Sequence, residues 1–114
     1  ILEEEFKKVC EELILTTDDG SNGKQGYAIN YLKEDVKKSK PDCIYACGPL
    51  PMLKAVQSFA KEENIPCQIS LEERMACGMG VCLGCAVKYV GDDKVNYKHV
   101  CKNGPVFKAT DVEI

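Results

Sequence analysis

The stretch ACGMGVCLGC, residues 76–85, gathers three cysteines and three glycines in one short segment. With Cys101, its Cys77, Cys82 and Cys85 follow the spacing C-x4-C-x2-C-x15-C. This spacing is the plant-type pattern by which four thiolates hold a [2Fe–2S] cluster. The glycines have no Cβ, so the backbone can take positive φ angles and fold closely around a small anion. The sequence therefore predicts an iron–sulfur centre held by these four cysteines, with electron transfer as its function.

Two other uses of the cysteines stay open at this point. Structural zinc sites usually have two C-x2-C pairs, or one such pair with a histidine pair, and here only Cys82 and Cys85 form one. A zinc-stabilised, non-redox binding module is therefore an alternative function. Eight cysteines in 114 residues would also suit the disulfide framework of a secreted protein. No signal peptide is visible, however, and the charged remainder is typical of a cytoplasmic chain.

The composition argues against nucleic-acid and membrane partners. The net charge is −3, with Lys and Arg spread among Asp and Glu, so no basic stripe for a phosphate backbone is present. No apolar run approaches the length of a bilayer span. The one histidine, His99, is expected at the surface, because the cysteine spacing requires no histidine ligand and a Rieske centre would need two.

Upstream of residue 72 the hydrophobic pattern alternates between helix and strand. The apolar run CIYAC, residues 43–47, is typical of a parallel strand buried on both faces. Gly48-Pro49 then turns the chain into a helix that carries Pro51 in its first turn. This rhythm predicts an α/β fold, with a partial open parallel sheet of βαβ units. The predicted segments are helix 1–10, strand 12–17, loop 18–26, helix 27–36, strand 43–47, helix 51–60 and strand 67–71.

From residue 72 onward the pattern is different. Two β-prone runs flank a turn, which predicts a β-hairpin in a small [2Fe–2S] module. The runs are residues 86–90 and 95–100, the turn is 91–94, and a short tail follows at 106–114. We therefore expect an α/β part, 1–71, and a cluster-binding module, 72–114. Three cysteines outside the loop are expected in the core: Cys10, Cys43 and Cys67.

Two turns at predicted strand ends are candidate nucleotide-binding sites, because ligands of open α/β sheets bind outside the carboxyl ends of the strands. Cys47, Gly48 and Pro49 could place a thiol and open backbone N–H groups beside a nicotinamide. Asp18 and Asp19 could accept hydrogen bonds from a ribose 2′-hydroxyl and would repel a 2′-phosphate, which favours NAD over NADP. A plain strand-to-helix turn and a solvated loop explain the same residues without a ligand.

Three stretches closely resemble the electron transfer subunits of type B dihydroorotate dehydrogenase, within the ferredoxin–NADP reductase-like superfamily. They are YACGPLPMLKAV at 45–56, SLEERMACGMGVCLGCAVK at 70–88 and VCKNGPVF at 100–107. The resemblance covers nearly the whole chain, and the cysteine block with its GPVF sequel is its most specific part. Iron–sulfur modules of other flavin-dependent NAD(P)H reductases are the nearest alternatives.

The resemblance implies a role in a redox relay of pyrimidine biosynthesis. In that family, dihydroorotate is oxidised at an FMN in a catalytic partner subunit, and electrons pass through a [2Fe–2S] cluster to FAD and on to NAD. It implies that the four cysteines of the C-x4-C-x2-C-x15-C pattern are the cluster ligands. It also implies that Cys47, Gly48 and Pro49 lie on the nicotinamide side, and that Asp18 and Asp19 lie near the adenosine half.

The sequence also departs from the family pattern. The family's flavin-binding β-barrel and glycine-rich phosphate loop are not in it, so residues 1–71 would be a partial NAD-binding domain. We therefore expect weak or absent FAD and NAD binding by this chain alone, since the pyrophosphate would lack its helix N-terminus. The chain alone is not expected to be catalytic. The part that is present resembles the carboxyl-terminal portion of the subunit.

Overall fold

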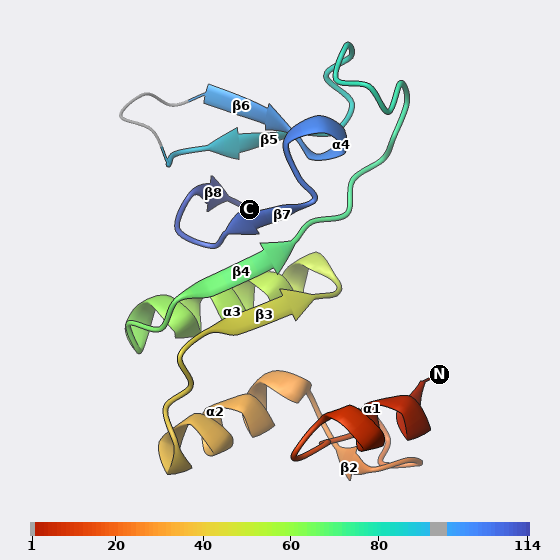
Figure 1. Cartoon of the computed structure of the whole chain (residues 1–114), viewed down its shortest axis with the longest axis vertical. Coiled ribbons are helices and arrows are strands. Elements are labelled where there is room, and N and C mark those ends of the chain that lie inside the picture. Colours follow the sequence, from red (N-terminus) through yellow and green to blue (C-terminus); the bar gives the residue numbers. More distant parts are fainter. Residues whose placement is uncertain (1, 92–95) are drawn as a thin grey trace. The chain divides into compact units, whose positions relative to one another are not determined.

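The computed structural model describes residues 2–91 and 96–114, and Figure 1 shows its elements. The chain forms two compact units, residues 1–40 and 41–114. The mixed α/β class is as predicted. Within the described ranges, no helix has the length and apolar character that a membrane span requires. The elements are α1 Glu3–Val9, β1 Thr16–Thr17, β2 Lys24–Gln25, α2 Ala28–Lys38, β3 Ile44–Cys47, α3 Leu50–Glu62, β4 Cys67–Ser70, β5 Ala86–Tyr89, β6 Asn96–His99, α4 Val100–Asn103, β7 Val106–Lys108 and β8 Val112–Glu113.

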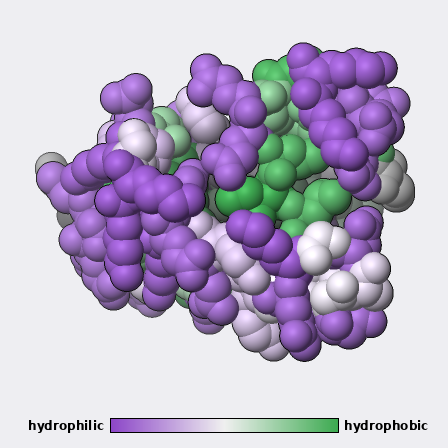
Figure 2. All heavy atoms as spheres, turned by 90° about the horizontal axis from the view of Figure 1, so that it is seen from below, coloured by the Kyte–Doolittle hydropathy of each residue, from purple (hydrophilic) through white to green (hydrophobic). Residues whose placement is uncertain are grey.

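The first unit contains α1 and α2 with a short two-stranded parallel sheet, β1–β2. The predicted helical period holds for α1, but its apolar side chains remain accessible, with Leu2, Phe6 and Val9 exposed by 56, 49 and 80 %. Figure 2 shows a face of the molecule that is largely hydrophilic but has one exposed apolar area. Among the described residues of this unit, Val36 alone is buried. The unit therefore has little core of its own.

The strand predicted over residues 12–17 is wrong in extent, since only Thr16–Thr17 is a strand. The chain turns back at once after it, and the Lys24 N–H donates to the Leu15 carbonyl at 2.8 Å. The predicted loop 18–26 therefore contains β2. A two-residue ladder satisfies only a few backbone groups, so the apolar run before it stays half-buried instead of forming a central strand.

The second unit is built on a βαβ unit, β3–α3–β4 (Figure 1). β3 and β4 pair in parallel, from Ile44 opposite Cys67 to Cys47 opposite Ser70, and α3 packs against both strands. Pro51 lies in the first turn of α3, as predicted. The third strand, β7, pairs antiparallel with β4. The parallel pairing predicted for this sheet is thus confirmed for two strands, and the sheet is mixed. The prediction that residues 43–47 are buried on both faces is wrong, because β3 is an edge strand of this sheet and Tyr45 is 74 % exposed.

The core of this unit lies between α3 and the central strand β4. Leu53 of α3 and Ile69 of β4 are 2 % and 0 % exposed. Of the three cysteines expected in the core, only Cys67 is buried, at 9 % exposure. Cys43 is half-buried. Cys10 is exposed because it is the residue at which α1 ends, in the unit that buries little.

A second sheet of three strands has the order β6–β5–β8. β5 and β6 pair antiparallel, with Ala86 opposite His99, as the predicted hairpin requires. Most of its predicted turn, residues 92–94, lies outside the described residues. The boundary predicted between residues 71 and 72 falls inside the second compact unit, since β4 and β7 from its two sides share a sheet. The division into 1–71 and 72–114 stays a prediction.

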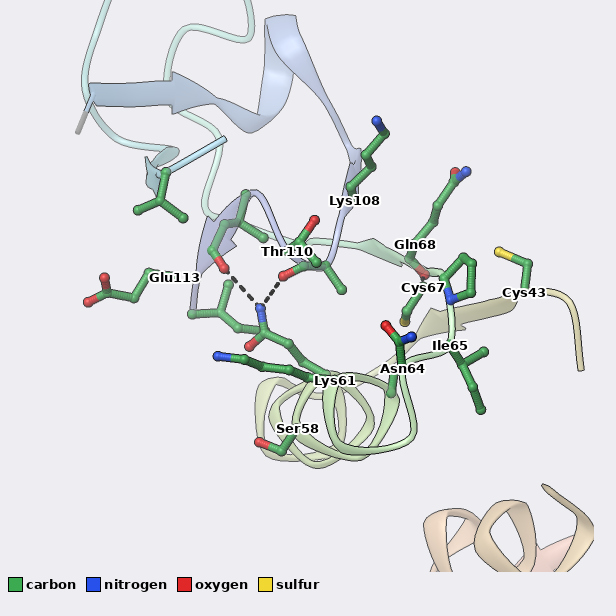
Figure 3. Close-up of a pocket in the computed structure, with 17 residues that line it drawn as sticks. Cys43, Ser58, Lys61, Asn64, Ile65, Cys67, Gln68, Lys108, Thr110 and Glu113 are labelled. Carbon is green, nitrogen blue, oxygen red and sulfur yellow. Dashed lines mark hydrogen bonds between the residues drawn. The ribbon is translucent and has the colours of Figure 1, made fainter. Parts of the chain in front are cut away.

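Gln57 of α3 joins the helix to the carboxyl-terminal segment. Its Nε2 donates to the carbonyl oxygens of Ala109 and Val112, at 2.5 and 2.9 Å (Figure 3). Val112 lies in β8, which pairs with β5. The single side chain therefore links the βαβ unit to the sheet that follows the cysteine loop.

Replacing Gln57 with leucine should lower the free energy of unfolding by about 1–3 kcal/mol, because two part-buried carbonyl groups lose their donor. The exposed neighbour Ser58 provides the control, and Ser58→Ala should change stability by less than about 0.5 kcal/mol. Urea unfolding followed by circular dichroism measures both variants. Equal stability of Gln57→Leu and the parent protein would show that the two hydrogen bonds contribute nothing.

Candidate functional site

The four predicted ligand cysteines come from a loop, a strand start and a helix of the second unit. Cys77 and Cys82 lie in the loop between β4 and β5, Cys85 directly precedes β5, and Cys101 lies in α4. The β5–β6 pairing carries α4 back to the loop, where the Val100 N–H donates to the Cys85 carbonyl at 3.0 Å. The structure thus brings these cysteines together, although Cys101 is far from the others in sequence.

Backbone donors surround the sulfur of Cys77. The N–H groups of Val81 and Cys82 each donate to its Sγ at 3.4 Å. Hydrogen bonds from the backbone of Cys82, Met79 and Val81, in that order, lower the pKa of the Cys77 thiol to about 6. A thiol with this pKa is mainly thiolate at neutral pH, which is the form that binds metals. The loop is therefore arranged to stabilise negative charge on sulfur.

The sulfurs lie in two pairs. The side chains of Cys77 and Cys82 hydrogen-bond one another. The pKa of Cys101 is raised, first by a side-chain hydrogen bond with Cys85 and then by burial, while a hydrogen bond from the Gly80 backbone acts in the opposite direction. The proximity of Cys77 adds a smaller upward contribution to the pKa of Cys101, so the two pairs lie near each other.

The two sulfur pairs differ in their exposure to solvent, and the loop that carries them also exposes apolar side chains. Cys85 is 2 % exposed, whereas Cys77, Cys82 and Cys101 are half-buried. All eight cysteines of the chain are free thiols. Three large apolar residues of the loop are directed to solvent, with exposures of 68, 78 and 76 %: Met79, Val81 and Leu83. One buried and three half-buried sulfurs with an exposed apolar rim suit a centre that exchanges electrons with a docked protein.

Within residues 2–91 and 96–114, no three Cys, His, Asp or Glu side chains are placed where they could hold one metal ion. A [2Fe–2S] cluster makes a different demand, because its four thiolates are divided between two irons. Two neighbouring thiol pairs with inward backbone N–H donors provide this donor set. The residues present therefore fit such a cluster.

Glycines allow the loop to curl around the sulfurs. Gly78 and Gly80 have φ angles of +68° and +80°, in the left-handed region that costs other residues about 1–2 kcal/mol. The aliphatic stem of Lys102 lies against Gly80, and an added Cβ there would stand 2.7 Å from the Lys102 Cδ. At Gly78 a Cβ would meet no atom within 4 Å.

Gly80→Ala should therefore reduce the iron bound per chain more than Gly78→Ala does. Both changes strain the backbone, but only the first also displaces Lys102 and the loop backbone that donates to Cys101. Iron analysis after anaerobic reconstitution measures the difference. Equal iron content in the two variants would contradict this packing argument.

Known proteins contain similar segments. Residues 72–113 match the family model described as the iron–sulfur cluster binding domain of dihydroorotate dehydrogenase B. The chain is 48 % identical, over 101 residues, to the dihydroorotate dehydrogenase B (NAD(+)) electron transfer subunit of Caldanaerobacter subterraneus subsp. tengcongensis. The chain belongs to this electron transfer subunit family. It is also 40 % identical, over 110 residues, to the probable electron transfer subunit of Methanopyrus kandleri.

The match covers most of this chain but less than half of each relative. It spans 89 % of the chain and 40 % of the Caldanaerobacter subunit, and 96 % of the chain and 39 % of the Methanopyrus subunit. A solved structure of an NADH-dependent reduced ferredoxin–NADP oxidoreductase, described for flavin-based electron bifurcation, superposes with a TM-score of 0.77 at 31 % identity. That likeness covers 99 % of this chain and 39 % of the other.

The residues that the dihydroorotate dehydrogenase B resemblance places near a nucleotide lie in both units. Cys47 is exposed at the carboxyl end of β3, and Gly48 and Pro49 turn the chain into α3. Asp18 and Asp19 belong to the first unit, so the structure does not place them relative to Cys47. Their roles in binding NAD stay predictions.

Asp19 already has a local structural role. Its Oδ1 accepts a hydrogen bond from the Ser21 N–H at 2.9 Å, which closes a tight turn. The pKa of Asp19 is lowered, chiefly by hydrogen bonds from the Ser21 side chain and backbone. Among the described residues, Asp18 has no comparable hydrogen bond.

His99 differs from its predicted surface position. The residue is half-buried, and its Nε2 is fully enclosed with no hydrogen-bond partner among the described residues. His99 lies two residues before Cys101 in the sequence, which could have indicated a position near the thiols. The prediction of a surface position was based on the cysteine spacing alone. Its partner across the hairpin, Ala86, follows Cys85 directly.

Proposed function

We propose that Cys77, Cys82, Cys85 and Cys101 hold a [2Fe–2S] cluster and that the chain carries single electrons through it. The observation that supports this most is the paired thiols with backbone N–H groups donating to the Cys77 sulfur. They lie in the segment that matches an iron–sulfur cluster binding domain. The two sulfur pairs suggest one iron for Cys77 and Cys82, and the other for Cys85 and Cys101.

The bound cluster would supply a one-electron redox couple, and the chain's own residues would set its properties. Thiolate ligation, backbone hydrogen bonds to sulfur and burial are the protein features that tune the potential of such clusters. Here the loop amides stabilise negative charge at Cys77, and the burial of Cys85 excludes water from one side. In this proposal the cysteine loop orients and shields the cluster.

The family suggests the donor and the acceptors. We infer that dihydroorotate is oxidised at the FMN of a catalytic dihydroorotate dehydrogenase subunit in the cytoplasm, and that electrons then pass to the cluster. From the cluster they would reach FAD and finally NAD, in pyrimidine biosynthesis. Cys47, Gly48 and Pro49 would face the nicotinamide, and Asp18 and Asp19 the adenosine half. This chain spans about 40 % of its relatives' length.

The apolar rim of the cysteine loop would face the catalytic subunit. Val81 and Leu83 expose 78 and 76 % of their surface beside Cys82. Electrons move between proteins only when the two centres come close, so the surface over the cluster must be the docking surface. Large exposed apolar side chains are favourable there because docking removes them from water.

The direct test mixes the anaerobically reconstituted protein with an FMN-containing dihydroorotate dehydrogenase catalytic subunit and adds dihydroorotate. Bleaching of the cluster absorbance is expected. Val81→Ala combined with Leu83→Ala should weaken the affinity for the catalytic subunit by about thirtyfold, from the loss of roughly 2 kcal/mol of apolar burial. Tyr97→Phe, on the hairpin, is the matched control. An unchanged affinity of the double variant would refute the docking surface.

A second function is favoured by the structural likeness to the ferredoxin–NADP oxidoreductase. The same module could serve another flavin-dependent NAD(P)H reductase. In that case the cluster would assemble normally, but dihydroorotate and the catalytic subunit would not reduce it. A reduced flavin would reduce it instead, which separates the two assignments.

A further inference from the structure

The imidazole of His99 has an enclosed ring nitrogen without a partner. Its Nε2 is fully buried and makes no hydrogen bond to any described residue. A buried donor or acceptor left unpaired destabilises the folded state, because its hydrogen bonds to water are lost without replacement. Buried polar groups are therefore nearly always paired, with protein, water or a bound group. Within residues 2–91 and 96–114 the polypeptide provides no such partner for this nitrogen, which leaves room for a bound group to be its partner.

The backbone holds His99 beside two of the ligand cysteines. Its N–H donates to Asn103 Oδ1 at 2.9 Å, which fixes it at the start of α4, the helix that carries Cys101. Across the hairpin it lies opposite Ala86, next to Cys85. The following residue, Val100, is 1 % exposed and bonds to the Cys85 carbonyl at 3.0 Å. His99 is therefore anchored between the strand start and the helix that provide one pair of sulfurs.

We propose that His99 donates a hydrogen bond from Nε2–H to a sulfur of the cluster and thereby raises its reduction potential. This rests on the proposed [2Fe–2S] function. The reduced cluster carries one more negative charge than the oxidised cluster, so a hydrogen-bond donor stabilises the reduced state more. Hydrogen bonds to the sulfurs are among the factors that set the potentials of iron–sulfur centres. His99 is then a positioning and tuning residue, not a ligand.

The sequence makes this proposal unusually easy to test, because the chain contains one histidine. Protein grown with ¹⁵N-histidine carries the label at His99 only. Pulsed electron paramagnetic resonance of the reduced cluster should detect a coupling to this nitrogen. The measurement uses the unaltered protein and so does not depend on whether a variant folds.

Potentiometry of variants gives the second readout. His99→Leu should lower the midpoint potential by the equivalent of a tenfold change in the reduction equilibrium, ~59 mV for one electron. His99→Gln retains an N–H donor and should recover part of the shift. Tyr97→Phe, at an exposed position of the same strand, should leave the potential unchanged.

A ¹⁵N coupling together with the shift in His99→Leu would establish the proposal. Absence of the coupling in a protein with full iron content would overturn it, and Nε2 would then be bonded to water. A protein that binds no iron would instead refute the [2Fe–2S] function itself. The two failures are thus distinguishable.

Discussion

Replacing Cys85 with serine is expected to remove nearly all iron from the protein. Cys85 is 2 % exposed and is paired with Cys101, so its loss deprives the proposed cluster of its most shielded ligand. A serine hydroxyl has a far higher pKa than a thiol and is a poor ligand for iron–sulfur clusters at neutral pH. The iron content per chain and the visible absorbance of the reconstituted protein measure the effect.

Cys10→Ser provides the matched control for this experiment. Cys10 is an exposed thiol in the first unit, outside the cysteine loop. Its replacement should leave the iron content unchanged. If Cys85→Ser bound as much iron as the parent, Cys85 would not be a ligand and the spacing argument would fail.

Ile69→Ala should cause the largest loss of stability among single core changes. Ile69 is fully buried in the central strand β4, where it lies opposite Ala46 on one side and Phe107 on the other. Truncating such a side chain usually costs about 2–5 kcal/mol through lost burial and the cavity that remains. For a unit of this size each kcal/mol lowers the melting temperature by about 4–8 °C.

Val106→Ala, on the neighbouring strand β7, is the comparison for Ile69→Ala. Val106 is 50 % exposed, so its truncation should change stability by less than 1 kcal/mol, on the order of other surface changes. Thermal unfolding of the cluster-free forms compares the two without a contribution from bound metal. A melting temperature for Ile69→Ala within 2–3 °C of that of Val106→Ala, on the scale of roughly 4–8 °C per kcal/mol, would mean that β4 is not the centre of the core.

Local patterns predicted the elements that depend on neighbouring residues. The apolar run at 43–47 became strand β3, although as an edge strand with Tyr45 exposed and not as a strand buried on both faces, and Pro51 marked the first turn of α3. The two runs around residue 91 became the antiparallel pair β5–β6. In each case the apolar residues and the turn residues that determine the element lie within a few positions of one another. A short stretch of sequence is therefore sufficient to predict the element.

The failures involve pairing between distant segments. Residues 106–114 were expected as a tail, yet they contain β7 and β8, which pair with β4 and β5. A three-residue strand has no period of its own, and its partners decide its conformation. The run before Thr16 was β-prone, but the early return of the chain at Lys24 left it without a long partner strand.

The cysteine spacing predicts Cys77, Cys82, Cys85 and Cys101 as ligands, because ligand spacing is a property of sequence. The structure brings these four side chains near one another, and their role as ligands stays a prediction. The surroundings of the thiols could not be predicted in this way. The enclosure of the His99 nitrogen depends on the hairpin register, which places His99 opposite Ala86. The spacing of residues along the chain does not reveal this register.

Analysis of iron, zinc and acid-labile sulfide in anaerobically purified protein tests the central claim most directly. A [2Fe–2S] cluster on the four cysteines predicts a red-brown protein with two irons and two sulfides per chain, about equal in amount, and a paramagnetic signal on reduction. Colourless protein with one tightly bound zinc and no sulfide would contradict the account, and would make the chain a zinc-stabilised module without a redox role.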